Sequence, residues 1–254
     1  MARQTAISIN TIPIGPLGII GMPGCEGLTD KIDQYLVKWR KTQASEHAES
    51  IAFFGYQRDT YKIDVSIPRF GSGEGKGVIN ESVRGYDIYI VCDVFNYSCS
   101  YDMYGRKVYM SPDDHFADLK RVISALCSKP KRVSVIMPML YEGRQHKRSS
   151  RESLDCAMAL KELVHLGVEN IITFDAHDQR VQNAIPDKSF ENVMPTYQMI
   201  KALVNNVEDL NVDKDHLMII SPDEGALHRC IYSTIFFSFF LALLLSFKED
   251  LLNI

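Results

Sequence analysis

A chain of 254 residues with a hydrophobic fraction of 46% is long enough for one large globular domain or two small ones. Its 28 Lys and Arg residues against 32 Asp and Glu residues give a net charge of −4, so composition offers no electrostatic case for a nucleic-acid partner. The start of the chain lacks the apolar core of a signal peptide, and the six cysteines form no Cys-x-x-Cys pair. We therefore expect a cytoplasmic protein with buried free thiols rather than disulfides or a zinc site.

The glycine-rich stretch RFGSGEGKG, residues 69–77, is the first candidate for a phosphate-binding loop. A Walker A loop needs four residues between its first glycine and its Gly-Lys pair, followed by Ser or Thr. Here only three residues separate Gly71 from Gly75, and Gly77 stands where the hydroxyl should be. On its own, the stretch predicts a surface turn rather than a P-loop.

Apolar runs typical of strands then alternate with segments typical of helices. Strands are expected at 87–94, 132–138, 170–178 and 216–225, and helices at 111–128, 149–167 and 196–206. Ser111 before Pro112 suits the start of the first helix, and a capping box from Ser149 to Glu152 suits the start of the second, which should close at Gly167. Strands that are almost continuously apolar indicate an α/β fold with a parallel sheet flanked by helices on both sides.

In such sheets ligands bind beyond the carboxyl ends of the strands. The strand at 132–138 is followed by a basic run that contains Arg144, Gln145, Lys147 and Arg148. Guanidinium groups match phosphate oxygens, so the run predicts a polyphosphate site. A solvated basic loop is the alternative.

The next two strands are followed by acidic residues. Asp175 and His177 come after 170–174, and Asp223 comes after 217–220. Helix capping and polar turns are the plain interpretation, and a shared site for a hard cation is the functional one. Basic residues for polyphosphate and acidic residues for Mg²⁺ at one sheet edge indicate phosphoryl or diphosphoryl transfer.

With these motifs in order, residues 69–229 resemble the ribose-phosphate diphosphokinases, also called phosphoribosyl pyrophosphate synthetases. The similar motifs are RFGSGE with INESVRGYDIYIV, YEGRQHKR, TFDAHDQRVQ and ISPDEGALHR. The resemblance implies a phosphoribosyltransferase-like, Rossmann-like domain at 1–190, the start of a second such domain at 191–230, and an atypical apolar tail at 231–254. It also implies a homo-oligomeric transferase of nucleotide biosynthesis that moves diphosphate from ATP to ribose 5-phosphate, giving phosphoribosyl pyrophosphate and AMP.

The resemblance also assigns site residues. The residues expected to bind ATP are Phe70, Glu74, Arg144 and Gln145. The residues expected to place Mg²⁺ are His177 and Asp223, with Asp175 as a further candidate. In the family, the loop that corresponds to 70–76 can reach the site of a neighbouring subunit.

Three departures separate the chain from the family pattern. Ser72 and His146 stand where the family motifs have acidic residues. After Arg229 the family's flexible loop with a catalytic Lys and Arg, and its loop for ribose phosphate, have no match, so no catalytic residue is assigned. We therefore keep a truncated, inactive homologue that binds nucleotide or a complete subunit as an alternative, and we expect little turnover by this chain alone.

The stretch 231–247 carries no charge. It is slightly short for a transmembrane helix and lacks the alternating faces of a domain helix. We interpret it first as a displaced reading frame and second as a membrane segment of an anchored interaction protein.

Overall fold

The computed structural model describes residues 14–46, 57–207, 210, 216–221, 225–227, 230–232 and 234–235. The chain divides after Val193 into two compact units. The elements of the first unit are β1 (Leu17–Gly21), α1 (Glu26–Glu46), β2 (Val65–Ser66), β3 (Val78–Ile79), β4 (Asp87–Val91), β5 (Ser100–Met103), β6 (Arg106–Tyr109), α2 (Pro112–Ala125), β7 (Arg132–Ile136), α3 (Asp155–His165), β8 (Asn170–Phe174), the 3₁₀ helix η2 (Gln179–Ala184) and β9 (Ser189–Val193). In the second unit the described helix α4 spans Thr196–Asn206.

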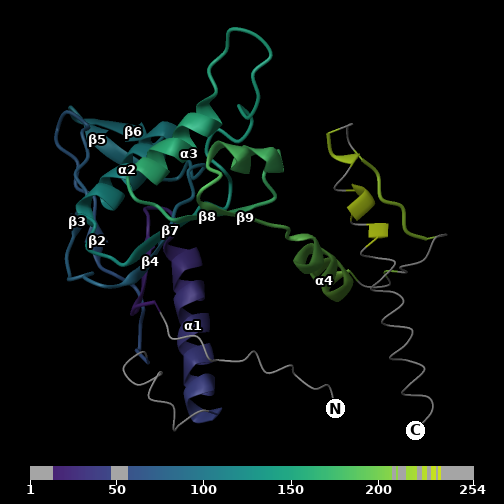
Figure 1. Cartoon of the computed structure of the whole chain (residues 1–254), viewed down its shortest axis with the longest axis horizontal. Helices are drawn as coiled ribbons and strands as arrows, with labels where there is room; N and C mark the ends of the chain where they lie inside the picture. The colour runs from purple at the N-terminus through teal and green to yellow at the C-terminus, as the bar shows by residue number, and fades with distance from the viewer. Residues whose placement is uncertain are drawn as a thin grey trace. The chain divides into compact units, whose positions relative to one another are not determined.

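Five strands of the first unit form one sheet in the order β1-β4-β7-β8-β9, and every pair in it is parallel (Figure 1). Two short antiparallel ribbons, β2–β3 and β5–β6, stand beside this sheet. The predicted parallel α/β sheet is thus confirmed.

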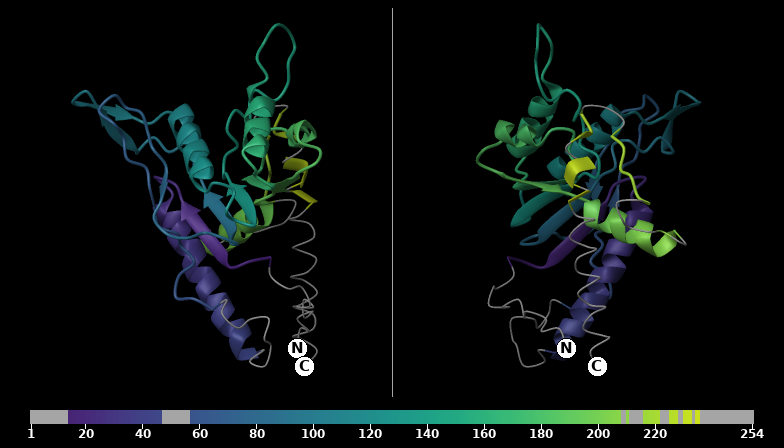
Figure 2. Two further views of the ribbon diagram at one scale, coloured as in Figure 1. Left: turned by 60° about the vertical axis from the view of Figure 1, so that its left-hand side comes forward. Right: turned by 90° about the vertical axis from the view of Figure 1, so that its right-hand side faces the viewer.

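The chain changes direction across the sheet at β1. On one edge β1 pairs with β4, and on the other the Ile19 N–H donates to the Tyr61 carbonyl at 2.7 Å, while the Ile63 N–H donates to the Ile19 carbonyl at 2.8 Å. Because parallel crossovers are right-handed, this reversal sends α1 to one face of the sheet and α2 and α3 to the other (Figures 1 and 2). The fold therefore has helices on both faces, and ligands of such sheets bind beyond the carboxyl ends of the strands.

Each face of the sheet has its own buried cluster. Ile88 and Ile90 of β4 pack in a cluster that includes Leu119 of α2. Val91, the next residue along β4, belongs to a second cluster against which Leu36 of α1 packs. Side chains that alternate along a strand point to opposite faces, so β4 is apolar on both sides because both of its faces are covered.

Two predicted helix starts had different outcomes. Ser111 caps α2 in a reciprocal capping box with Asp114, so that start is confirmed. The helix expected from 149 instead begins at Asp155, without a side-chain cap. Glu152 accepts from the Ser149 N–H at 3.3 Å, but within a turn, because short side chains can satisfy the backbone locally instead of starting a helix. The predicted end is confirmed: Gly167 follows the helix with φ +96°.

In the second unit α4 matches the predicted helix at 196–206, but the predicted strand at 216–225 is wrong for the residues described there. Residues 216–221 form no strand, and Met218 and Ile220 are 80% and 75% exposed. A strand needs a second strand to pair with, and no described residue of this unit belongs to a strand. Within the described ranges no helix is long and apolar enough to cross a membrane. Asp223 and residues 236–254 lie outside the described residues.

Candidate functional site

Residues 69–77, called here the glycine loop, form an ordered turn. Arg69 and Gly75 pair in an isolated antiparallel bridge, the Phe70 N–H donates to the Glu74 carbonyl at 2.9 Å, and the Gly73 N–H donates to the Phe70 carbonyl at 2.8 Å. Gly73 has φ +92°, a conformation that favours glycine. The predicted surface turn is confirmed.

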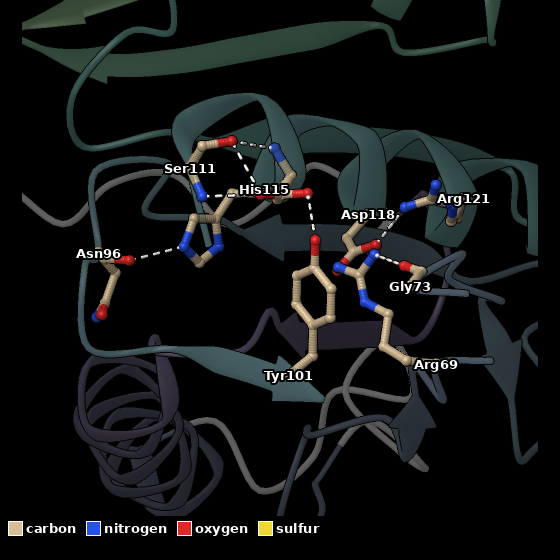
Figure 3. A network of polar contacts seen from close by, with 9 residues as sticks. Arg69, Gly73, Asn96, Tyr101, Ser111, His115, Asp118 and Arg121 are labelled. Carbon is tan, nitrogen blue, oxygen red and sulfur yellow. Dashed lines mark hydrogen bonds and ion pairs between the residues drawn. The ribbon is translucent and has the colours of Figure 1, made fainter. Parts of the chain in front are cut away.

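Arg69 fixes this loop to α2 (Figure 3). Its guanidinium group donates to the Asp118 carboxylate at 2.5 Å and to the Gly73 carbonyl at 3.1 Å, and it lies 4.4 Å from the centre of the Tyr101 ring. Asp118 also accepts from Arg121 at 2.5 Å, and its side chain is only 2% exposed. Burial raises the pKa of Asp118, and the two guanidinium groups oppose that rise.

The hairpin β5–β6 closes the other side of the glycine loop. Tyr104 and Gly105 join its strands with φ +49° and +75°, the signs that a type I′ turn requires. The Tyr104 N–H donates to the Gly71 carbonyl at 2.9 Å, and a Cβ at Gly73 would lie 3.0 Å from the sulfur of Met103. Held from both sides, the loop still leaves Phe70 58% exposed.

Residues 141–153, called here the basic loop, follow β7 and are also tied to α2. The Tyr141 ring stacks on Phe116 with centroids 4.2 Å apart, and its hydroxyl donates to Asp113 at 2.6 Å. Burial and the Asp113 carboxylate both raise the pKa of Tyr141. Arg144 is exposed, whereas the Gln145 side chain donates to the Ser153 carbonyl at 2.8 Å, inside its own loop.

The basic loop meets the loop after β8 at two histidines. The ring centroids of His146 and His177 lie 5.0 Å apart, and the His146 Nε2 lies 3.7 Å from the Asp178 carboxylate. Burial lowers the pKa of His146. Asp178 accepts from the backbone and guanidinium of Arg180, which hold the pKa of that carboxyl well below its usual range. Asp175 has φ +44°, and its N–H donates to the Val193 carbonyl at 3.0 Å.

The donors at this edge fit magnesium only in part. Among the described residues no group of three or more His, Cys, Asp or Glu side chains is placed to hold an ion. Mg²⁺ prefers oxygen ligands and usually keeps water and substrate phosphates. The side chains that meet here are two imidazoles and the Asp178 carboxylate, which accepts from Arg180. Asp175, the predicted carboxylate, lies two positions before His177 in the chain.

The glycine loop and this edge share no direct polar contact among the described residues of one chain. No hydrogen bond or ion pair between described residues joins Phe70 or Glu74 to Arg144, Gln145 or His177. The sequence reasoning missed Asp118, Tyr101 and Tyr141, which position the two loops. Of these features, only the hairpin had a local signal in the sequence. Polar and apolar residues alternate before Tyr104-Gly105, as is typical of a strand that leads into a tight turn.

Comparison with known proteins shows the family and the fold of the chain. The family model for the N-terminal domain of ribose phosphate pyrophosphokinase matches residues 17–167. The ribose-phosphate pyrophosphokinase of Vibrio parahaemolyticus is 25% identical over 169 residues, which cover 65% of this chain and 47% of the relative; that of Aquifex aeolicus is 25% identical over 171 residues, covering 65% and 48%. The phosphoribosylpyrophosphate synthetase structure from Mycobacterium smegmatis shares the fold, with a TM-score of 0.64 and 18% identity over 87% of this chain and 61% of the other. The chain thus spans about half the length of the curated relatives it matches.

Proposed function

Because the chain belongs to the ribose phosphate pyrophosphokinase family, we propose that it binds Mg-ATP through the glycine loop and the basic loop, for transfer of diphosphate from ATP to ribose 5-phosphate. The observation that carries the proposal is the glycine loop itself. It is fixed to α2 by a buried ion pair, yet it leaves the aromatic ring of Phe70 more than half exposed. An exposed ring on a loop that is tied to the helix through Arg69 is suited to receive a planar ligand.

The adenine end of ATP is assigned to Phe70 and Glu74. The Phe70 ring offers a stacking surface for a purine, since every base has a π-face. The Glu74 carboxylate accepts from the Ser72 hydroxyl at 2.7 Å, which orients it, and its remaining lone pairs can accept from an exocyclic amine. Ser72 thus takes up a supporting role at a position where the family motif has an acidic residue.

The phosphate end is assigned to the edge beyond β7 and β8. Arg144 is exposed there beside Lys147 and Arg148, and forked guanidinium donors suit phosphate oxygens. His177 and Asp175 stand where the magnesium ion of the nucleotide would lie. Because no hydrogen bond or ion pair joins the described residues of the glycine loop to this edge in its own chain, we propose that the loop serves the edge of a second copy, so that a homo-oligomer assembles the site. Six free thiols suit a reducing cytosol as its setting.

A second candidate function is nucleotide binding without turnover. Two features favour it: Gln145 is engaged inside its own loop, and His146 replaces an acidic residue next to the proposed magnesium position. In this case the chain binds ATP but forms no AMP that depends on ribose 5-phosphate.

Calorimetric titration of the folded chain with Mg-ATP tests the proposal. The Arg144→Ala change should weaken binding by about 1.5–3 kcal/mol, the worth of one hydrogen bond to a charged group. Arg84→Ala is the matched control, because Arg84 is an exposed arginine before β4, at the opposite edge of the sheet. A folded chain that binds no ATP would overturn the proposal. An assay for AMP with and without ribose 5-phosphate then separates transfer from binding alone.

A further inference from the structure

An open groove of about 460 Å³ lies between α2 and α3, on the side of α3 that is turned away from its buried residues. Its lining consists of one residue of α2 and one face of α3 with the residue that follows it: Lys120, Met158, Lys161, Glu162, His165 and Leu166. Small-molecule sites have volumes of about 300–1,000 Å³, and this groove falls within that range. It contains no residue of the glycine loop or the basic loop, so it is separate from the loops assigned to ATP.

The floor of the groove is apolar. Met158 is 58% exposed, and Leu166, which lines the same groove, is half-buried. A single exposed methionine is ordinary on a protein surface, but this one lies in a concave place. The other walls are the carbon stems of long charged side chains, whose heads stay in water. The groove can therefore remove an apolar body from water, which is favourable in proportion to the buried apolar area.

The charges around the groove leave a positive surplus. The Lys120 ammonium donates to the Glu162 carboxylate at 2.8 Å, so these two charges offset each other between α2 and α3. Lys161 is exposed and makes no hydrogen bond or ion pair with another described residue. His165 lies in the last turn of α3, where a helix carries partial negative charge, so an anion is favoured beside Lys161 rather than at the helix end. The groove thus complements an apolar body that carries one negative charge.

We propose that this groove binds a small amphiphile: an apolar chain or ring that ends in one anionic head group, a carboxylate or a phosphate. The head lies beside Lys161, and the apolar body covers Met158 and Leu166. The proposal goes beyond the proposed function and does not rest on it. One wall of the groove is α2, which anchors the glycine loop and the basic loop through Asp118 and Asp113, so the occupant contacts the helix that positions both loops.

Calorimetric titration of the nucleotide-free chain with four octyl compounds tests it: octanoate, octyl phosphate, octan-1-ol and octylammonium. At least one of the two anions should bind, and the tighter of them identifies the head group. The alcohol should bind about 3- to 10-fold more weakly, the worth of one charged contact at an exposed position, and the cation more weakly still. Lys161→Ala should weaken anion binding by the same factor. Lys161→Glu should reverse the preference, so that octylammonium binds more tightly than octanoate.

Met158→Glu tests the floor of the groove at an exposed position, where the change should leave the core intact. A carboxylate in the floor should abolish detectable binding of the anions, because it repels their head group and removes apolar surface. Met139→Glu is the matched control, since Met139 is 53% exposed and lies outside the groove. Methyl NMR of labelled methionine locates the ligand: the signal that the Met158→Glu chain lacks should shift when octanoate is added to the wild type.

Three results would overturn the proposal. The first is a wild-type chain that binds neither anion, and the second is octan-1-ol binding as tight as that of the anions. The third is equal anion binding by the wild type and the Met158→Glu chain. Sedimentation of the same variant covers the other occupant: if Met158→Glu changes the oligomeric state, the groove is an interface between copies of the chain, and the proposal fails in that case too.

Discussion

The carboxylate of Asp118 on α2 lies 2.5 Å from the guanidinium of Arg69, the first residue of the glycine loop. The same helix holds the basic loop through Asp113, which accepts from the Tyr141 hydroxyl at 2.6 Å. One helix packed on the sheet thus carries the anchors of both loops that we propose to bind ATP. The loops are positioned by the core of the domain, and each can be loosened separately.

Replacing Asp118 should destabilise the domain. Asp118→Ala leaves Arg69 and Arg121 without their shared counter-charge, and removing one partner of a buried ion pair costs about 3–5 kcal/mol. Urea unfolding should show that loss in the free energy of unfolding. Arg121→Ala is the control. The Arg121 side chain is 33% exposed and Asp118 stays paired with Arg69, so the free energy of unfolding should fall by no more than about 1 kcal/mol. Equal losses for the two variants would contradict the assignment of Asp118 as the anchor.

Gly73→Ala should distort the glycine loop. The φ of +92° costs an L-residue roughly 1–2 kcal/mol, and the added Cβ would lie 3.0 Å from the Met103 sulfur and 3.2 Å from the Tyr101 ring. Calorimetry should show weaker ATP binding. Gly71→Ala, two positions earlier, places its Cβ in open space and should change ATP affinity by less than about 0.5 kcal/mol. If Gly71→Ala proves the more harmful change, the shape assigned to the loop is wrong.

Phe70→Ala should weaken ATP binding without weakening the fold. A stacked base is worth about 1–3 kcal/mol, whereas the ring is 58% exposed and contributes little to the core. The two measurements are the ATP affinity and the urea midpoint of the same preparation. Tyr97→Ala, which removes another exposed ring, should alter neither. Unchanged ATP affinity in the Phe70 variant would remove this residue from the proposed site.

The cysteines should react with iodoacetamide in an order set by burial. Burial raises the pKa of Cys25 and of Cys156 to about 11, so at pH 8 only about one thiol in a thousand is the reactive thiolate. Cys127 is exposed and should be alkylated first. Mass spectrometry of peptides from native protein gives the order, and protein in urea, where all six thiols should react, is the control. Early alkylation of Cys156 in native protein would contradict the burial described for α3.

Three strands of the sheet, β4, β7 and β8, could be predicted from their apolar runs, whereas β1 and β9 were not predicted. The runs around β4, β7 and β8 are almost continuously apolar, and a short run of this kind between polar segments is typical of a parallel strand covered on both sides. The start of α2 could also be predicted, because Ser111 and Asp114 each accept a hydrogen bond from the backbone N–H of the other within one turn. The expectation that most cysteines are buried holds for half of them: Cys25, Cys92 and Cys156. Cysteine lies near apolar residues in the sequence even where its own side chain faces solvent, as at Cys127.

The failures have two causes: competing local hydrogen bonds and partners that are distant in the sequence. Ser149 and Glu152 have the spacing of a capping box, but a turn satisfies the same groups, and the sequence does not say which will form. Residues 216–221 have the apolar pattern of a strand, yet a strand exists only when another pairs with it. Asp118 and Arg69 are 49 positions apart, so no local pattern connects them. From the sequence, His146 could be identified only as a departure from an acidic residue of the family motif. Only the fold shows that its ring lies against that of His177.

A buried carboxylate shared by two arginines also constrains how such a protein can change over generations. Arg121 can be lost first, because Asp118 still neutralises Arg69, whose side chain is 11% exposed. Asp118 cannot easily be lost first, since that step leaves the guanidinium groups of Arg69 and Arg121 without a counter-charge. Descendant lineages should therefore include chains that have replaced Arg121 and kept Asp118, while chains that have replaced Asp118 should have replaced Arg69 as well. The ion pair in Figure 3 would then be inherited as a unit, together with the shape of the loop that it fixes.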